Sequence, residues 1–271
     1  MEAPRVQRVT IGSGAAARDI AVLCRPGGAP GLFWLSGYTS DMNGTKATAL
    51  DAYAAKSGIA CARFDYSGHG QSGGDFLAGT ISDWREEAIA IFDGFTTGPQ
   101  IAIGSSMGGW IALLLADGLR RRGEHRLAGL ILIAPATDMT KALMWDSYSK
   151  KDRKELTTTG VYRQPGEAER NHNIVTLKLI EDGAKHLFGE RLIETGCPVH
   201  ILHGTRDDSV PWQLSTALVA RLASDDVVLT LVKDGDHRLS RPEDIERMIA
   251  AVAAMRAEIA IVAKSEVAKS E

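Results

Sequence analysis

The chain of 271 residues has little cysteine, few aromatic residues and no excess of basic charge. Its formal net charge is −3, which argues against a surface built to bind nucleic acid. The three cysteines are an odd number, and each lies in or beside a run of residues typical of a buried strand. We therefore expect buried, reduced thiols and a cytoplasmic protein, because reducing compartments keep such thiols free.

Long apolar runs are also missing. No uncharged apolar stretch approaches the length that would cross a bilayer, so no membrane span is expected, and the first residues lack the apolar segment of a secretion signal. The last residues, 263–271, contain a repeated short polar motif, which predicts a disordered tail. What remains is the composition of an ordinary globular protein, with 24% charged and 44% hydrophobic residues.

Strand-like and helix-like segments alternate along the chain. Two strand-like runs, 6–11 and 18–25, come first, and we expect them to pair antiparallel. The other strand-like runs are 31–36, 59–65, 99–104, 127–135, 197–203 and 227–233. The helix-like segments are 45–57, 81–95, 107–123, 211–223 and 242–262. This alternation predicts an α/β fold with an eight-stranded, mostly parallel sheet, helices on both faces, and ligands at the carboxyl ends of the strands.

One connection is too long to be an ordinary loop between two strands. It covers residues 137–195, and its second half, from 173 to 188, carries apolar residues at helical spacing. We interpret it as a mostly helical cap. The prediction is therefore a core made of residues 1–136 and 196–262, with the cap inserted at 137–195.

The most informative motif is GSSMG at 104–108, between a buried strand-like run and an apolar helix-like run. It is a G-x-S-x-G sequence in strand–turn–helix context, where a tight turn lifts the central serine above the sheet. The helix that follows places its positive dipole end and its first N–H groups at the same point. We therefore predict that Ser106 is a nucleophile.

A serine hydroxyl needs a base to take its proton, and the base needs a third group to hold it. In this architecture the acid and then the histidine follow the serine along the chain. His237 lies after the last strand-like run and before the last helix-like segment, so we predict it as the base. Asp207 and Asp208 both follow the preceding strand-like run, and from their position either of them could be the acid.

In acyl transfer, negative charge develops on the carbonyl oxygen of the substrate, and two backbone N–H groups are needed to stabilise it by hydrogen bonds. We predict the N–H of Met107, directly after the nucleophile, as the first donor. The second is expected from Tyr38, because Gly37 lets the chain turn back beneath the substrate. The alternative is that Tyr38 contributes its ring rather than its amide.

Two other patterns are similar to binding motifs, one for a dinucleotide and one for a metal ion, but we expect neither site. GHGQSG at 68–73 satisfies G-x-G-x-x-G, but the next helix cannot begin until about Ser82, whereas a dinucleotide site needs a helix on that loop. We interpret His69 as a structural loop residue. His200 and His203 lie three apart on a strand, point to opposite faces and cannot share a metal ion. The sequence therefore predicts no cofactor and no metal.

These residues resemble the α/β-hydrolase family over nearly the whole chain. SGY at 36–38 takes the place of the family's His-Gly-x oxyanion motif, and the stretch at 64–73 is similar to the loop after its fourth strand. HGTRDDSVP at 203–211 resembles its H-G-x-x-D-x-x-V-P segment, which implies Asp207 as the acid. GDHRLS at 235–240 is similar to a subgroup of mitochondrial thioesterases and acyl-glucuronide esterases.

The resemblance implies a serine hydrolase that cleaves ester or thioester bonds of acyl substrates through an acyl-enzyme on Ser106. The substrate would be a small acyl compound or an acylated protein. The alternatives are an aminopeptidase-like enzyme, a general carboxylesterase, or a non-catalytic scaffold on this fold. In the cap, Trp145, Tyr148 and Tyr162 either line the acyl site or form the cap's own core, and the charged run 150–155 is expected to face solvent. The oligomeric state stays open.

Overall fold

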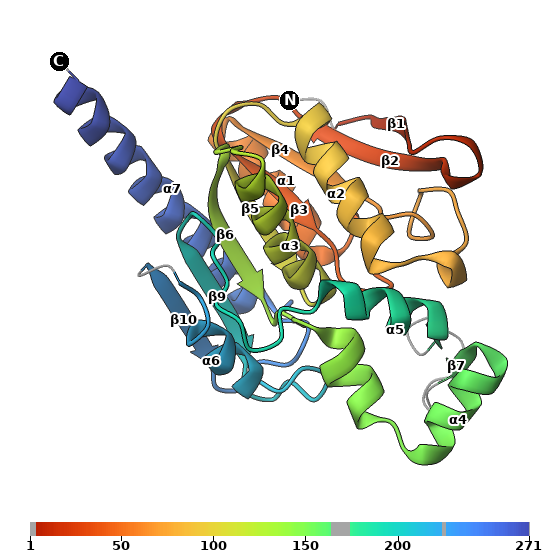
Figure 1. The fold of residues 1–271 in the computed structure, drawn as a ribbon. Helices are drawn as coiled ribbons and strands as arrows, with labels where there is room; N and C mark the ends of the chain where they lie inside the picture. The colour runs from red at the N-terminus through yellow and green to blue at the C-terminus, as the bar shows by residue number, and fades with distance from the viewer. Residues whose placement is uncertain (1–3, 164–173, 224–225, 271) are drawn as a thin grey trace.

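A single sheet of eight strands organises the protein (Figure 1), in the order β1-β2-β4-β3-β5-β6-β9-β10. The computed structural model describes residues 4–163, 174–223 and 226–270, with side chains as far as 261. The pairs β1–β2 and β2–β4 are antiparallel, and the other pairs are parallel. The predicted α/β fold and its mostly parallel sheet are confirmed. The strands are β1 (Val6–Ile11), β2 (Arg18–Arg25), β3 (Gly28–Leu35), β4 (Ile59–Phe64), β5 (Gln100–Ser105), β6 (Leu127–Ile133), β9 (Val199–Gly204) and β10 (Val227–Val232).

Helices cover both faces of this sheet. One face packs against α2 (Ile81–Phe95), α3 (Met107–Arg121) and α6 (Gln213–Val219), and the other against α1 (Thr45–Ser57) and α7 (Pro242–Ser270). Side chains of a strand alternate between the faces, so both sides of a central strand are buried. This is why the central strands read as continuous apolar runs in the sequence.

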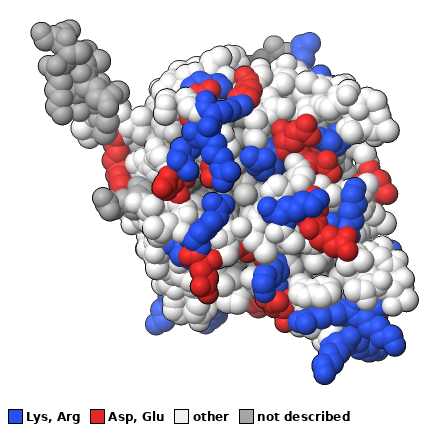
Figure 2. All heavy atoms as spheres, viewed as in Figure 1, with Lys and Arg blue, Asp and Glu red and all other residues white. Residues whose placement is uncertain are grey.

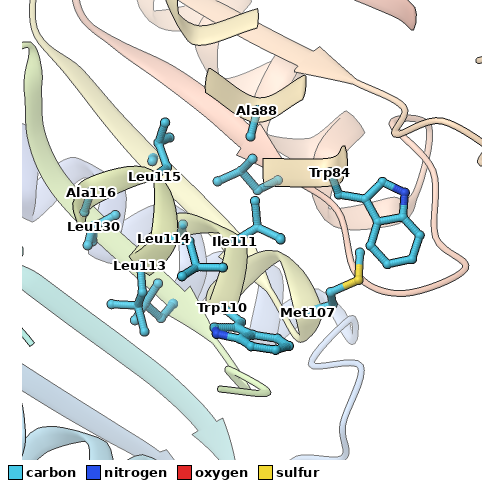
Figure 3. Close-up of a cluster of buried hydrophobic side chains, with 14 of the residues drawn as sticks. Trp84, Ala88, Met107, Trp110, Ile111, Leu113, Leu114, Leu115, Ala116 and Leu130 are labelled. Carbon is cyan, nitrogen blue, oxygen red and sulfur yellow. The ribbon is translucent and has the colours of Figure 1, made fainter. Parts of the chain in front are cut away.

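The most deeply buried helix is α3. Figure 3 shows its apolar side chains meeting Trp84 and Ala88 of α2, with Leu130 of β6 in the same cluster. Both Trp110 and Ile111 of α3 have no exposed surface. Close packing on all sides fixes the position of this helix, and therefore of the turn that precedes it.

The segment between β6 and β9 lies outside the eight-stranded sheet and contains more than helices. Its regular elements are a π-helical turn (Thr140–Met144), α4 (Lys150–Thr159), a short hairpin of β7 (Val161–Arg163) and β8 (Ile174–Thr176), and α5 (Leu177–Gly183).

The prediction of helix from 173 onward was wrong for residues 174–176, and residue 173 lies outside the described residues. These three residues pair with β7, and the Thr176 side chain accepts the N–H of Leu179, which caps α5 at its start. The helical spacing in this stretch therefore coincides with a strand followed by a short helix.

The last helix is longer than predicted, whereas α6 is shorter. α7 continues to Ser270, so the backbone of residues 263–270, which we expected to be disordered, is helical. No glycine or proline follows Pro242 in this stretch, so the sequence has no residue that would end the helix. α6 covers only Gln213–Val219 of the predicted 211–223. The end of α7 extends away from the sheet (Figure 1).

Acidic and basic side chains are interspersed over the face shown in Figure 2, and basic residues gather at the tip of the cap. Lys150, Lys151 and Lys154 of α4 are exposed, as expected for a solvated face. Arg153 instead lies over the ring of Trp145, at 5.2 Å from its centroid. Within the described chain, no helix is long and apolar enough to cross a membrane.

Candidate functional site

Ser106 occupies a strained turn between β5 and α3. Its backbone angles, φ 54° and ψ −119°, are rare for any residue other than glycine. A Cβ on Gly104 would lie 2.2 Å from the carbonyl oxygen of Gly108, and a Cβ on Gly108 would lie 2.1 Å from that of Leu35. Strand and helix therefore approach too closely for side chains at either position, and Ser106 stands at the N-terminus of α3.

His237, in the loop after β10, reaches this serine. Its Nε2 lies 3.1 Å from Ser106 Oγ, and its Nδ1 lies 2.7 Å from Asp207 Oδ2. Because an ionised carboxylate only accepts hydrogen bonds, Nδ1 carries the hydrogen and Nε2 is free to accept the serine proton. Three segments that are far apart in the sequence thus meet at the carboxyl end of the sheet.

The buried carboxylate of Asp207 accepts four hydrogen bonds. Its Oδ1 accepts the N–H groups of Ser209 at 2.9 Å and Val210 at 2.7 Å. Its Oδ2 accepts from His237 and, at 3.1 Å, from Nε2 of His203. Burial alone would raise the pKa of Asp207, but the hydrogen bonds from His203, His237 and Val210 outweigh it and hold the pKa well below its usual range. Asp207 is therefore an anion at neutral pH.

Asp208 lies elsewhere. It is exposed, and its side chain accepts a hydrogen bond of 3.4 Å from the hydroxyl of Ser209. The structure therefore places Asp207, rather than its neighbour, against His237.

The sequence predicted no role for His203 in the site. It has no exposed surface, and its Nε2 lies 2.9 Å from the carbonyl oxygen of Val210 as well as near Asp207. A carbonyl oxygen only accepts, so Nε2 carries a hydrogen, while Nδ1 lies 2.6 Å from the hydroxyl of Ser215. The signal was the spacing HGTRD, which puts a histidine four residues before the acid.

The two predicted backbone donors belong to segments that adjoin Ser106. Met107 is the first residue of α3, where N–H groups have no partner within the helix. On the other side, a Cβ on Gly37 would lie 3.4 Å from Ser106 Cβ, and Tyr38 borders the same cavity as the serine. The hydroxyl of Tyr38 donates to the carbonyl oxygen of Ile174 in β8, at 2.6 Å. The side chain of Tyr38 is therefore engaged with the cap.

The cavity beside Ser106 has a volume of about 440 Å³ and polar walls. Lys46, Arg206 and Arg238 supply positive charge to it, and Asp208 and Asp236 supply negative charge. Lys46 donates to the carbonyl oxygen of Arg238, and burial lowers the pKa of Lys46 to about 8. None of the described cap residues lines this cavity.

Of the cap residues Trp145, Tyr148 and Tyr162, the two tyrosines belong to the cap's own core. The rings of Tyr148 and Tyr162 lie 4.9 Å apart and are buried with Leu156 and Val175, so they form the cap's own core. Trp145 borders a second cavity of about 540 Å³, with apolar walls that include Leu177, Ile180 and Leu187.

The pattern at 68–73 does not open a helix. A short 3-10 turn, Phe76–Ala78, follows it, and α2 begins at Ile81, where the Thr80 side chain accepts the N–H of Asp83. Across residues 4–163, 174–223 and 226–270, no group of three or more His, Cys, Asp or Glu side chains is placed to hold a metal ion.

Comparisons with known proteins show the family of this chain. Residues 32–173 match the family described as serine aminopeptidase, S33. The mitochondrial palmitoyl-protein thioesterase ABHD10 of Homo sapiens is 36% identical over 224 residues, which are 82% of this chain and 72% of that protein. Its counterpart in Mus musculus is 35% identical over 227 residues, which are 83% of this chain and 75% of that protein. These names are mitochondrial, so the predicted cytoplasmic location has no support from these relatives.

Solved structures show the same fold. A protein of Agrobacterium vitis S4, assigned as a hydrolase, is 48% identical with a TM-score of 0.90, over 94% of this chain and 100% of the other. Alpha/beta hydrolase domain-containing protein 10 from mouse is 31% identical with a TM-score of 0.83, over 93% and 99% of the two chains. Est1E from Butyrivibrio proteoclasticus, with ferulic acid bound, is 19% identical with a TM-score of 0.71, over 90% and 96%, and shows the likeness of fold alone.

Proposed function

Because this chain belongs to the serine aminopeptidase S33 family of α/β-hydrolases, we propose that it cleaves acyl thioesters and esters with Ser106 as the nucleophile. The observation that carries the proposal is the chain of hydrogen bonds from Ser106 Oγ through His237 to Asp207, at 3.1 Å and 2.7 Å. Each contact lies within the reach that proton transfer needs.

The reaction follows from these contacts. His237 Nε2 takes the Ser106 proton while Oγ forms a bond to the carbonyl carbon of the substrate. The N–H groups of Met107 and Tyr38 hold the oxygen that becomes negative. Collapse of this intermediate breaks the bond to the leaving thiol or alcohol, which takes the proton from His237. Water then repeats the sequence, with His237 again as base, and releases the acid from Ser106.

The names of the relatives are the reason for preferring thioesters. The curated relatives are named palmitoyl-protein thioesterases, and the cap of this chain holds an apolar cavity of about 540 Å³. The cavity beside Ser106 is polar and suits the leaving group better than a long alkyl chain. We therefore propose that a long acyl chain lies outside this polar cavity, and that the substrate is a small acyl thioester or an acylated protein.

The location that fits best is a reducing compartment. Cys24, Cys61 and Cys197 are free, and Cys61 and Cys197 are buried. Burial raises the pKa of Cys24 to about 11 and that of Cys61 to about 12, so both remain neutral thiols. This property suits the cytoplasm and the mitochondrial matrix alike.

One observation favours a second candidate function, that of an aminopeptidase. Asp208 and Asp236 line the cavity beside Ser106 and offer negative charge to a substrate amine. Lys46, Arg206 and Arg238 line the same cavity and would repel that amine, so ester and thioester cleavage stays the first choice.

A fluorophosphonate probe tests the nucleophile. The folded protein is expected to gain one probe adduct at Ser106, and Ser106→Ala is expected to gain none and to lose turnover of acyl thioesters. The control is Ser105→Ala at the neighbouring position, which should still be labelled. A folded wild-type protein that stays unlabelled and inactive would instead indicate a non-catalytic scaffold.

A panel of acyl thioesters, aryl esters and aminoacyl amides with matched acyl groups ranks the substrate classes. We expect the highest kcat/KM for thioesters, followed by esters. Faster cleavage of amides than of esters would reverse the order of the two candidate functions.

A further inference from the structure

His69 lies outside the candidate triad, yet it contacts the loop that carries the second predicted backbone donor. The N–H of Thr39, the residue after Tyr38, donates to Nε2 of His69 at 3.2 Å. On the other side of the ring, Nδ1 lies 3.0 Å from the carbonyl oxygen of Ser67. A carbonyl oxygen only accepts, so Nδ1 carries the hydrogen and Nε2 is left as the acceptor for Thr39. Both ring nitrogens are therefore used, with opposite roles.

Thr39 needs such a partner, because its backbone is unusual. Its φ is 58°, a left-handed conformation that β-branched residues rarely adopt. A residue keeps such a conformation when its surroundings over-determine it. Two contacts at this residue do so: the hydrogen bond to His69, and the Thr39 hydroxyl, which donates to the carbonyl oxygen of Tyr38 at 2.6 Å.

The ring of His69 has little freedom to move away. It is 4% exposed, and the rings of Trp84 and Phe76 lie edge-on to it with centroids 5.2 Å away. The carbonyl of Ser67 that orients the ring is itself fixed, since Ser67 N–H donates to the buried carboxylate of Glu87 at 3.0 Å. A rigid chain of contacts thus runs from α2 through His69 to the loop beside Ser106.

We propose that His69 is a positioning residue: it holds the backbone at Thr39 and thereby fixes the preceding Gly37–Tyr38 peptide, so that the Tyr38 N–H faces the oxyanion formed on Ser106. The inference rests on the proposed function and adds to it the residue that orients the second donor. A neutral His69 is essential to this role, because a second ring proton would remove the acceptor of Thr39. Burial lowers the pKa of His69 and so favours the neutral ring.

Two substitutions separate the roles of the two ring nitrogens. His69→Gln keeps an acceptor near the position of Nε2, whereas His69→Asn keeps a donor near Nδ1 and loses the acceptor for Thr39. We expect His69→Asn to lower kcat for a p-nitrophenyl ester about 10²-fold, with KM nearly unchanged. The reason is that a misplaced donor stabilises the transition state less but leaves substrate binding almost unaffected. His69→Gln is expected to recover most of the lost kcat.

The controls distinguish this inference from the proposed function. His200→Asn changes a half-buried histidine whose Nε2 contacts Thr230, and kcat should stay at the wild-type value. Loss of activity in Ser106→Ala tests the proposed function by itself. If Ser106→Ala is inactive while folded His69→Asn turns over like wild type, the role of His69 is wrong and the proposed function stands. Equal losses in His69→Asn and His69→Gln would also contradict the role.

A measurement on the wild-type protein keeps the inference testable even if His69→Asn does not fold. Nitrogen-15 NMR of the imidazole rings should show His69 as the neutral Nδ1–H tautomer, with Nε2 unprotonated and accepting a hydrogen bond. A spectrum that shows His69 with hydrogen on Nε2 would overturn it, because that nitrogen could not accept from Thr39.

Discussion

At the scale of single residues, the carboxylate of Asp207 holds the candidate site together. One oxygen is occupied by the backbone of its own turn and the other by His203 and His237. This division fixes the carboxylate plane and leaves His237 one orientation. The second histidine, His203, adds a donor that keeps the acid ionised.

Replacement of Asp207 by Asn is expected to lower kcat by about 10⁴-fold, as loss of the acid does in other serine triads. The backbone N–H groups of Ser209 and Val210 would retain the amide oxygen, so the NH₂ group would face His237 and force the wrong tautomer. Steady-state kinetics on an acyl thioester measure the loss. Asp208→Asn is the matched control, and a loss as large there would contradict the assignment of Asp207.

At the scale of elements, the turn from β5 to α3 depends on glycines that cannot carry a side chain. Gly108→Ala would put a Cβ 2.1 Å from the carbonyl oxygen of Leu35. We expect a loss of about 3 kcal/mol in the free energy of unfolding, because the close-packed backbone cannot yield.

The control for this substitution is Gly94→Ala in α2, where a Cβ would meet nothing within 4 Å. It should raise the free energy of unfolding by about 0.5–1 kcal/mol, since alanine loses less backbone entropy in a helix. Urea unfolding measures both variants. Equal stability of Gly108→Ala and wild type would show that the turn relaxes freely.

Glu87 of α2 accepts the N–H of Ser67 in the loop after β4, and its contribution to the free energy of unfolding is expected to depend on pH. Burial raises the pKa of Glu87 to about 7, although the Ser67 N–H and Arg18 favour its charged form. Because the pKa of Glu87 is higher in the folded than in the unfolded protein, protonation of Glu87 favours folding. This contribution to stability is complete below the pKa of Glu87 in the unfolded chain and is lost as pH rises through 7. Glu87→Gln should therefore flatten the fall in the free energy of unfolding between pH 5 and pH 8, by about 1–3 kcal/mol.

Urea unfolding at several pH values measures this slope. Glu86→Gln is the matched control, because Glu86 also pairs with Arg18 but its side chain is 57% exposed. The same slope in Glu87→Gln and wild type would mean that Glu87 is ionised throughout this range.

Elements whose signal lies in a few neighbouring residues could be predicted from the sequence. The turn at Ser106 is one, because glycine, serine and the two flanking runs define it locally. The cap hairpin is not, since residues 174–176 fit a helical spacing and are also β-branched, and only pairing with β7 decides between them. The choice between Asp207 and Asp208 likewise depends on how one turn directs each side chain, and it came from the family resemblance rather than from physical argument.

The roles of His69 and His203 could not be predicted for a related reason. Each is defined by hydrogen bonds to residues from another element or loop, such as Thr39 and Ser215. Without the fold, a loop histidine and a strand histidine have no visible partners.

At the scale of the whole molecule, one sheet brings the site together from distant parts of the chain. Ser106, Asp207 and His237 follow β5, β9 and β10, whose carboxyl ends lie on the same edge because these strands are parallel. The predicted sheet was sufficient to place the site at this edge. The sheet does not determine where segments outside the core lie, and the end of α7 is one such segment.

Removal of residues 262–271 is expected to leave kcat/KM within about twofold of wild type and the free energy of unfolding within about 0.5 kcal/mol. Among the side chains of α7 that the structure describes, Val252 and Met255 are buried against the sheet, whereas Ile261, the last of them, is 66% exposed. As a control, Val252→Ala should cost about 2 kcal/mol. Thermal unfolding and thioesterase assays measure both, and a large loss on truncation would reveal a role for the end of α7.

Tyr38 joins two parts of the molecule that must both serve a substrate. It borders the cavity at Ser106, and its hydroxyl donates to the carbonyl of Ile174 in the cap. An acyl group bulky enough to displace β8 would therefore also shift Tyr38, the residue proposed as the second oxyanion donor. Selection by size would then be visible in turnover as well as in affinity, and kcat should fall along a series of increasingly branched thioesters.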